Sequence, residues 1–169
     1  MSNRILISFG IVAALFMTSA VSAQELDTRR ALTLDAAKAM AAACIEYAEA
    51  RERTINVWIY DVTGNPIYFH RMDGAAIVGM ETSRRKGITA LKSGATSGEV
   101  DVFFEDAGIA GGLIAIQSDW MGNPGGVPVI VDGHLIGSVG AGGMGQQPDH
   151  ECASAAANVV IPPDQRPAD

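Results

Sequence analysis

The segment 127–140, VPVIVDGHLIGSVG, constrains the fold more than any other part of the sequence. Two apolar, β-branched runs flank Asp132 and Gly133, a pair that suits the type I′ turn of a two-residue β-hairpin. Two further runs with the composition of strands, 55–61 and 67–71, enclose the turn sequence VTGNP. Because a hairpin pairs its strands antiparallel, the sequence predicts a largely antiparallel sheet.

Three other segments have the composition and spacing of helices. Residues 32–53 are rich in alanine and repeat apolar side chains every three or four positions, with Thr33 in the position of an N-cap. Residues 79–93 predict a second helix that ends at Gly94, and residues from about 148 to 160 predict the last one. We expect these helices to pack on the sheet.

The region between the second helix and the last hairpin is less regular. Residues 111–117, GGLIAIQ, predict one more strand, whereas residues 94–110 predict a long loop over a site. The predicted order is α-β-β-α-β-β-β-α, with a five-stranded sheet in a single α/β domain of the α+β type over residues 32–160. The Pro-rich residues 161–169 predict a disordered tail.

Residues 1–23 have the pattern of a secretory signal peptide. One cation, Arg4, precedes an apolar run over residues 5–17, and small residues lead up to Ala23. This run is shorter than the roughly 20 residues that span a bilayer. We therefore expect cleavage after Ala23 and a periplasmic or secreted protein.

The chain is acidic. It has 12 Lys and Arg against 19 Asp and Glu, and loss of Arg4 with the signal peptide would change the net charge from −7 to −8. An acidic chain without a basic run argues against nucleic acid as a partner, and against a membrane once the signal is removed. A small anionic ligand would need a local basic pocket.

The predicted mature chain contains two cysteines, Cys44 and Cys152, in two different predicted helices. Export makes a disulfide between them chemically feasible. Two buried free thiols agree with the sequence equally well, because the sequence does not give the Cα separation that a disulfide requires.

No segment carries a motif for a metal ion or a nucleophile. The histidines His70, His134 and His150 are far apart in the sequence, and neither cysteine belongs to a CxxC pair. The glycine-rich GAGGMG ends a hairpin strand rather than opening a βαβ unit, so it does not indicate a nucleotide site. What remains is three unusual segments: HRMDGA at a strand end, ETSRRKGITA with its cations, and GNPGG before the last hairpin.

With two more segments, these three make the chain resemble a known family. It is the family of small haem-binding and haem-degrading-type proteins that includes HbpS, GlcG and the C-terminal domain of PduO. The resemblance covers about residues 32–160 and implies the same order of helices and strands. The matching segments are LTLDAAKAMAAACIEYA, VWIYDVTGNPIYFHRMDGA, ETSRRKGITA, GGVPVIVDGHLIGSVGAGGM and DHECASAA.

The resemblance implies a homo-oligomer with a pocket near a subunit interface. Arg71 and Lys86 would pair there with a carboxylate of a small anionic ligand. Asp73 would orient Arg71 or accept a hydrogen bond from the ligand, while Gly125 and Gly126 would let the ligand approach the backbone. The alternative is an ion pair between Arg71 and Asp73 that only fixes the turn.

The resemblance also implies a ligand: haem, another anionic tetrapyrrole or a carboxylated metabolite. Haem iron usually takes an axial histidine. The haem-binding members have theirs in the N-terminal part of the domain, whereas no histidine here precedes His70. The candidates are His70 and His150, since His134 follows a hairpin turn and should be exposed. His150 lies near the start of the last helix, whose positive end favours a neutral imidazole that can bind a metal.

Two other functions stay open on the sequence alone. One is an enzyme that acts on a small 2-hydroxy or 2-keto acid, with Asp73, Glu81 or His150 as acid or base. The other is a non-catalytic, oligomeric accessory protein. The sequence does not decide whether the chain catalyses a reaction.

Overall fold

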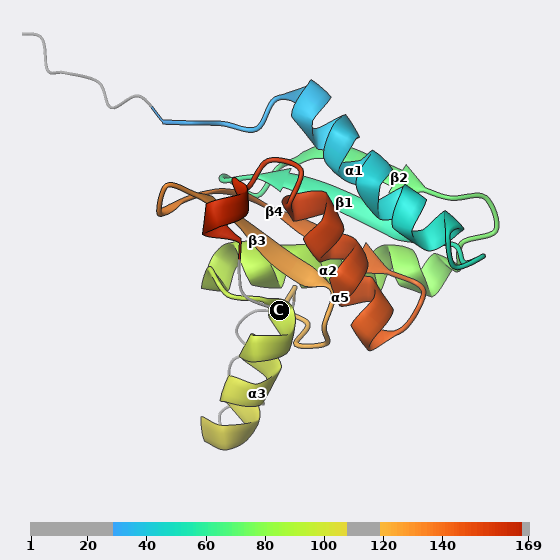
Figure 1. Cartoon of the computed structure of the whole chain (residues 1–169). Coiled ribbons are helices and arrows are strands. Elements are labelled where there is room, and N and C mark those ends of the chain that lie inside the picture. The colour runs from blue at the N-terminus through green and yellow to red at the C-terminus, as the bar shows by residue number, and fades with distance from the viewer. Residues whose placement is uncertain (1–28, 108–118, 167–169) are drawn as a thin grey trace, which may run out of the picture.

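The computed structural model describes residues 29–107 and 119–166. Their elements are α1 (Leu34–Glu49), β1 (Asn56–Asp61), β2 (Pro66–Arg71), α2 (Ile77–Ser93), α3 (Ser97–Ala107), β3 (Gly126–Val131), β4 (His134–Gly142), α5 (Gln146–Ala157) and a short 3-10 helix, η1 (Pro163–Gln165). Figure 1 shows their arrangement. They form one domain of the α+β type.

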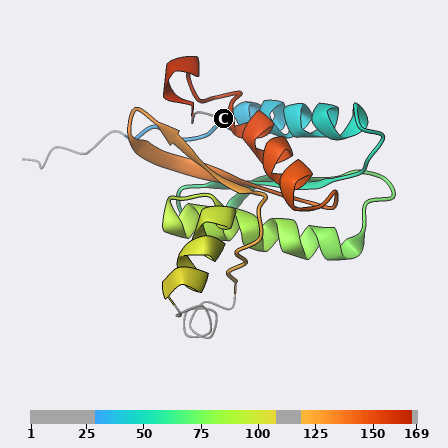
Figure 2. The ribbon, with the colours of Figure 1, turned by 60° about the horizontal axis from the view of Figure 1, so that its bottom comes forward.

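The sheet is antiparallel throughout, with the strand order β2-β1-β4-β3. Helices α1 and α5 lie on one face, and α2 lies on the other (Figure 2). The expectation of five strands is wrong for the part of the chain described, where the sheet has four. The predicted strand at 111–117 lies outside the described residues.

The local signals in the sequence account for the ends of several elements. Asp132 and Gly133 have φ angles of 51° and 74°, and the type I′ turn requires positive values at both positions. The hydroxyl of Thr33 accepts a hydrogen bond from the backbone N–H of Ala36 at 3.1 Å, as an N-cap does. Gly94 ends α2 in the left-handed conformation. These three predictions are confirmed.

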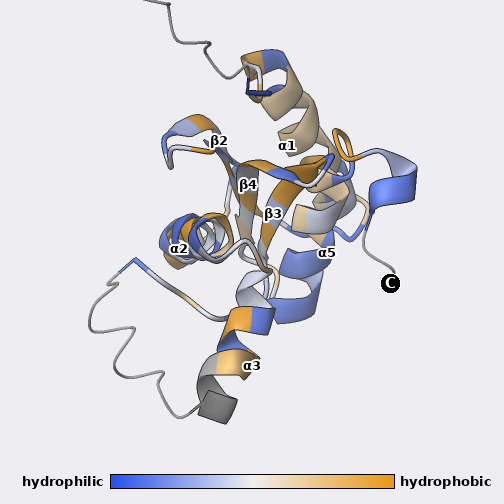
Figure 3. Cartoon of the chain, turned by 90° about the vertical axis from the view of Figure 1, so that its left-hand side faces the viewer, coloured by the Kyte–Doolittle hydropathy of each residue, from blue (hydrophilic) through white to orange (hydrophobic). Residues whose placement is uncertain are grey.

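The main hydrophobic core lies between the sheet and the pair α1 and α5. It includes the fully buried Met40, Ile59 and Val129, and β3 is among the most hydrophobic segments in Figure 3. A disulfide joins Cys44 of α1 to Cys152 of α5 inside this core, with a Cα–Cα distance of 4.6 Å. The bridge settles the question that the sequence left open.

Helix α2 packs on the opposite face at very short range. A Cβ atom added to Gly140 of β4 would lie 2.0 Å from the carbonyl oxygen of Ser83, and one added to Gly87 would lie 2.9 Å from the ring of Tyr60. Real side chains do not tolerate such distances, so only glycine allows the helix and the strand to approach this closely. The close packing fixes where the side chains of α2 lie relative to the sheet.

Helix α3 replaces most of the long loop that the sequence predicted over 94–110. Its start has a capping box: the Glu99 carboxylate accepts hydrogen bonds from the N–H and the hydroxyl of Thr96, and the Thr96 hydroxyl accepts one from the Glu99 N–H. The helix projects away from the sheet (Figures 1 and 2).

Residues 161–166, part of the segment that the sequence predicted to be disordered, are ordered and pack on the domain, and residues 167–169 lie outside the described part of the chain. Ile161 is 5% exposed in the core, and the Arg166 guanidinium donates hydrogen bonds to the carbonyl groups of Ile161 and Asn158. Asp132 connects both ends of the domain, because it pairs with Arg30 and exchanges hydrogen bonds with Gln165. None of the helices described is long and apolar enough to cross a bilayer.

Candidate ligand-binding groove

A groove of about 1010 Å³ runs along α5. Its other walls are the edge strand β3 and residues 94–96, which lead from α2 into α3. The hairpin turn at 132–133 and part of the C-terminal segment also border it. The volume lies at the upper end of the range of roughly 300–1,000 Å³ that is usual for small-molecule sites.

Helix α5 has two distinct faces. The stripe that lines the groove follows helical spacing of three and four residues: Gln147, His150, Glu151, Ser154 and Asn158. The face toward the sheet and α1 is buried: Asp149, Cys152, Ala153 and Ala156. The disulfide at Cys152 therefore holds the core side of the helix whose outer side forms the groove.

The strand side of the groove is apolar. Val127, Pro128 and Ile130 of β3 line it, and Ile161 adds a further apolar side chain. Pro128 has no backbone N–H, and an edge strand is the place where a sheet tolerates this loss. The groove can therefore bury a flat apolar surface against β3.

The carboxylates of the groove already have partners within the protein. Glu99 caps α3 through Thr96. The carboxylate of Glu151 accepts hydrogen bonds from the Tyr47 hydroxyl and from the Gln147 amide. The hydrogen bond from Tyr47 has the largest effect on the pKa of Glu151 and lowers it, and the bond from Gln147 lowers it further. Glu151 is therefore ionised at neutral pH.

His150 is the one histidine of the groove lining. It is partly buried, and its ring makes no hydrogen bond to the residues described. A ring nitrogen is therefore available to a ligand. This is the property that a metal-binding imidazole needs.

Beneath the groove, an ion pair connects α2 to α5. Lys86 Nζ lies 2.8 Å from Asp149 Oδ2, and the two side chains are 5% and 4% exposed. Asp149 Oδ1 also accepts a hydrogen bond from the N–H of Met144 at 2.8 Å. Sequence reasoning missed Asp149, because its partner lies 63 residues away on another helix.

The two adjacent glycines predicted for the ligand site contact this ion pair. A Cβ atom on Gly125 would lie 2.9 Å from Lys86 Cδ and 3.0 Å from Asp149 Cβ, and one on Gly126 would lie 2.0 Å from the Lys86 carbonyl oxygen. The close approach that the glycines allow is therefore between elements of the protein. Val127, which follows Gly126, lines the groove itself.

The structure does not bring Arg71 and Lys86 together. Arg71 ends the edge strand β2, whereas Lys86 packs where β3 begins, at the opposite edge of the sheet. Arg71 donates two hydrogen bonds, of 3.1 and 2.8 Å, to the carbonyl oxygen of Ala75. Asp73 is exposed and forms no ion pair with Arg71. Arg71 therefore fixes the turn after β2, but through the backbone rather than through Asp73.

The remaining candidates also lie away from the groove. His70 is on the edge strand β2, with its ring centroid 6.5 Å from that of Tyr68. Glu81 of α2 binds the guanidinium groups of Arg84 and Arg85. The hydrogen bonds from Arg84, which have the largest effect, and from Arg85 lower the pKa of Glu81 to about 2. Only His150, among the histidines and acids proposed from the sequence, faces the groove.

Comparisons with known proteins agree with this fold. A family model described as haem degrading protein HbpS-like matches residues 32–158. An uncharacterised 15.0 kDa protein from the dhaT-dhaS intergenic region of Citrobacter freundii is 34% identical over 131 residues, which are 74% of this chain and 89% of that protein.

Solved structures of similar proteins have the same fold. A double mutant of HbpS from Streptomyces reticuli superposes with a TM-score of 0.74 at 30% identity and covers 83% of this chain and 95% of its own. A complex of PduOC with haem superposes with a TM-score of 0.72 at 25% identity, over 78% of this chain and 96% of that one. The protein ORFY of Klebsiella pneumoniae has a TM-score of 0.74 at 26% identity, over 82% and 97%.

Proposed function

Since the chain belongs to the HbpS-like family, we propose that it binds haem in the groove along α5, with His150 as the axial ligand. The observation that carries the proposal is the position of His150. It is the one imidazole in the lining, it is partly buried, and no described residue forms a hydrogen bond with its ring. A similar protein, PduOC, has been solved with haem bound.

The lining of the groove fits the ring system of haem. Val127, Pro128 and Ile130 supply an apolar wall on the strand side, and Ile161 adds to the apolar lining. Burial of an apolar ring face against such a wall is favourable by roughly 25 cal/mol per Å². His150 stands on the helix side, so a ring held against β3 would present its iron toward the imidazole.

The carboxylates of haem fit only the rim of the groove. Its lining contains no lysine or arginine among the described residues. Arg51 and Arg166, however, contact lining residues from outside: Arg51 at Tyr47 and Glu151, and Arg166 at Asn158 and Ile161. The ligand would therefore keep its iron inside the groove and its carboxylates at the edge. Bound haem would supply the redox-active iron, and this chain would supply the imidazole, the apolar wall and the rim cations.

A haem titration tests the proposal. The purified chain is expected to give a Soret band that saturates, and His150→Ala is expected to weaken binding by about tenfold or more, because the iron loses its protein ligand. His70→Ala serves as the matched control, since His70 lies on β2 and should leave affinity and spectrum unchanged. If the wild-type chain gives no saturable Soret band, the proposal is wrong. If His70→Ala removes the band and His150→Ala does not, the site is on the other edge of the sheet.

We also propose that the protein is exported. The disulfide between Cys44 and Cys152 supports this, since such bonds persist in oxidising compartments. Cleavage after Ala23 would leave a chain that begins at Gln24. The intact mass of the protein isolated from its native cells is the measurement, and a mass that includes residues 1–23 would contradict the proposal.

A further inference from the structure

We propose that Arg51 makes the groove selective for a tetrapyrrole that carries free carboxylates over the same ring with esterified ones. This inference rests on the proposed function, because it concerns the orientation of a ligand in the same groove. It assigns to one rim cation the recognition that Lys86 cannot supply from its buried ion pair.

Arg51 lies just beyond the end of α1, beside the groove. Its guanidinium carbon is 3.5 Å from the ring centroid of Tyr47, Nη1 donates to the Tyr47 carbonyl oxygen at 3.2 Å, and Nη2 is 3.9 Å from Glu151 Oε2. Tyr47 and Glu151 both line the groove. The stacking on Tyr47 holds the planar guanidinium at the rim, where two adjacent N–H groups can meet a carboxylate.

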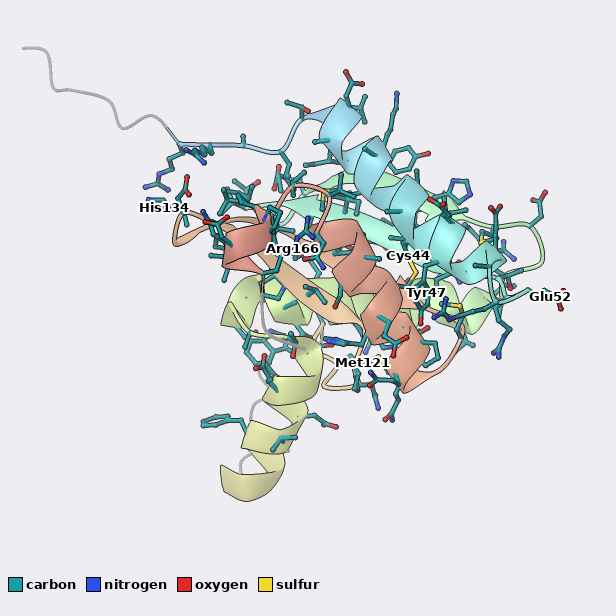
Figure 4. The ribbon with its side chains drawn as sticks, viewed as in Figure 1. Cys44, Tyr47, Glu52, Met121, His134 and Arg166 are labelled. Carbon is teal, nitrogen blue, oxygen red and sulfur yellow. A yellow bond between two sulfur atoms is a disulfide. The ribbon has the colours of Figure 1, made fainter. Side chains whose placement is uncertain are left out.

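The position of Arg51 along α5 matches that of His150. Glu151, which Arg51 contacts, is the next residue after His150, whereas Arg166 binds the carbonyl of Asn158, eight residues further along the helix. Eight residues correspond to about 12 Å at the rise of an α-helix. Figure 4 shows Tyr47 and Arg166 toward opposite ends of α5. Carboxylates at the edge of a ring centred near His150 would therefore meet Arg51 first.

Arg166 and Arg51 also differ in how many of their guanidinium N–H groups already donate hydrogen bonds within the protein. Arg166 donates from Nε and Nη2 to the carbonyl oxygens of Ile161 and Asn158, at 3.2 and 2.8 Å, which closes the C-terminal end of α5. The Arg51 guanidinium makes one hydrogen bond within the described part of the chain, and the side chain is 46% exposed. A guanidinium has five N–H donors, so Arg51 keeps several for a ligand.

Glu151 has the opposite effect at the same place. Its carboxylate lies beside Arg51 and lines the groove, so it repels a carboxylate that approaches the guanidinium. Loss of the Glu151 charge should therefore increase the preference for free carboxylates over esters. Loss of Arg51 should remove the same preference. The pair therefore offers two variants with predictions of opposite sign.

The test compares haem with its dimethyl ester as ligands of the purified chain, in one solvent at low ionic strength. For an exposed charge pair we expect the wild-type chain to bind haem about threefold to fivefold more tightly than the ester. Arg51→Gln should remove this ratio, Arg51→Lys should retain part of it, and Glu151→Gln should increase it. Lys38→Gln, at an exposed position of α1 outside the groove lining, is the matched control and should leave the ratio unchanged. Arg166→Gln tests the other rim cation, and its effect should be smaller than that of Arg51→Gln. Circular dichroism checks that each variant is folded.

The possible results separate the two proposals. If the wild-type chain binds haem and the ester equally, or if Arg166→Gln removes the preference and Arg51→Gln does not, the role of Arg51 is refuted while haem binding stands. If the chain binds neither ligand, haem binding itself is refuted, and the role of Arg51 with it. A ratio that is lost in Arg51→Gln and raised in Glu151→Gln supports the inference.

Discussion

Replacement of Lys86 by methionine is expected to lower the free energy of unfolding by about 3–5 kcal/mol. The change leaves the Asp149 carboxylate, which is 4% exposed, without the cation that lies 2.8 Å away. The buried carboxylate then keeps only the hydrogen bond from the Met144 N–H, which does not compensate for the loss of its hydration and of its counter-ion. The loss is large against the roughly 5–15 kcal/mol that stabilises an ordinary domain, and urea unfolding at equilibrium measures it.

A double variant distinguishes the buried charge from a simple packing defect. In Lys86→Met with Asp149→Asn, the amide oxygen can still accept the N–H of Met144, which Asp149 Oδ1 accepts in the native chain. We expect this variant to recover most of the lost stability, because no uncompensated charge remains. Lys38→Met, at an exposed position of α1, should change stability by less than about 0.5 kcal/mol. A loss below about 1 kcal/mol for Lys86→Met would mean that the pair acts like a surface ion pair.

The burial of Lys86 could have been predicted from the spacing of α2. Arg84, Arg85 and Lys86 are consecutive, so each is turned by about 100° from the one before. Lys86 falls on the same face as Ser83 and Gly87, which contact the sheet, whereas the two arginines bind Glu81 on the outer side. Lys86 was predicted to bind a ligand with Arg71, although its place on the sheet-facing side of α2 favours a buried partner within the protein.

Helix α3 also had a signal in the sequence. Thr96 and Glu99 have the spacing of a capping box, and the structure contains its hydrogen bonds. The irregular pattern of residues 94–110 indicated a loop instead. Hydrogen bonds at the helix end outweighed the low helix propensity of Gly98.

The hairpins were predictable and the groove was not, for one physical reason. A type I′ turn depends on two neighbouring residues, Asp132 and Gly133, whose preferences are visible in the sequence. The groove depends on which side of α5 faces β3, and on the strand order β2-β1-β4-β3 that puts β3 at an edge. Contacts between distant segments decide both, and the sequence of a single chain does not give them.

Removal of the disulfide is expected to lower the stability of the domain about as much as Lys86→Met does. In the variant Cys44→Ala with Cys152→Ala, we expect a loss of about 4 kcal/mol, because the bridge spans 108 residues and restricts the unfolded chain strongly. For a domain of this size such a loss lowers Tm by about 15 °C. Thermal unfolding under oxidising conditions, followed by circular dichroism, measures the difference from the wild-type chain.

The burial of both sulfur atoms predicts how a reductant will act. Cys44 and Cys152 are 0% exposed, so a thiol reagent can reach the bridge only after α1 and α5 separate. Dithiothreitol should therefore reduce the bridge slowly in native buffer and quickly in urea, and the reduced wild-type chain should then unfold near the midpoint of the double variant. The double variant itself should not respond to dithiothreitol, which makes it the control. Rapid reduction in native buffer would show that α5 leaves the core readily, and the groove that its outer face forms would then lack the rigid wall on which His150 depends.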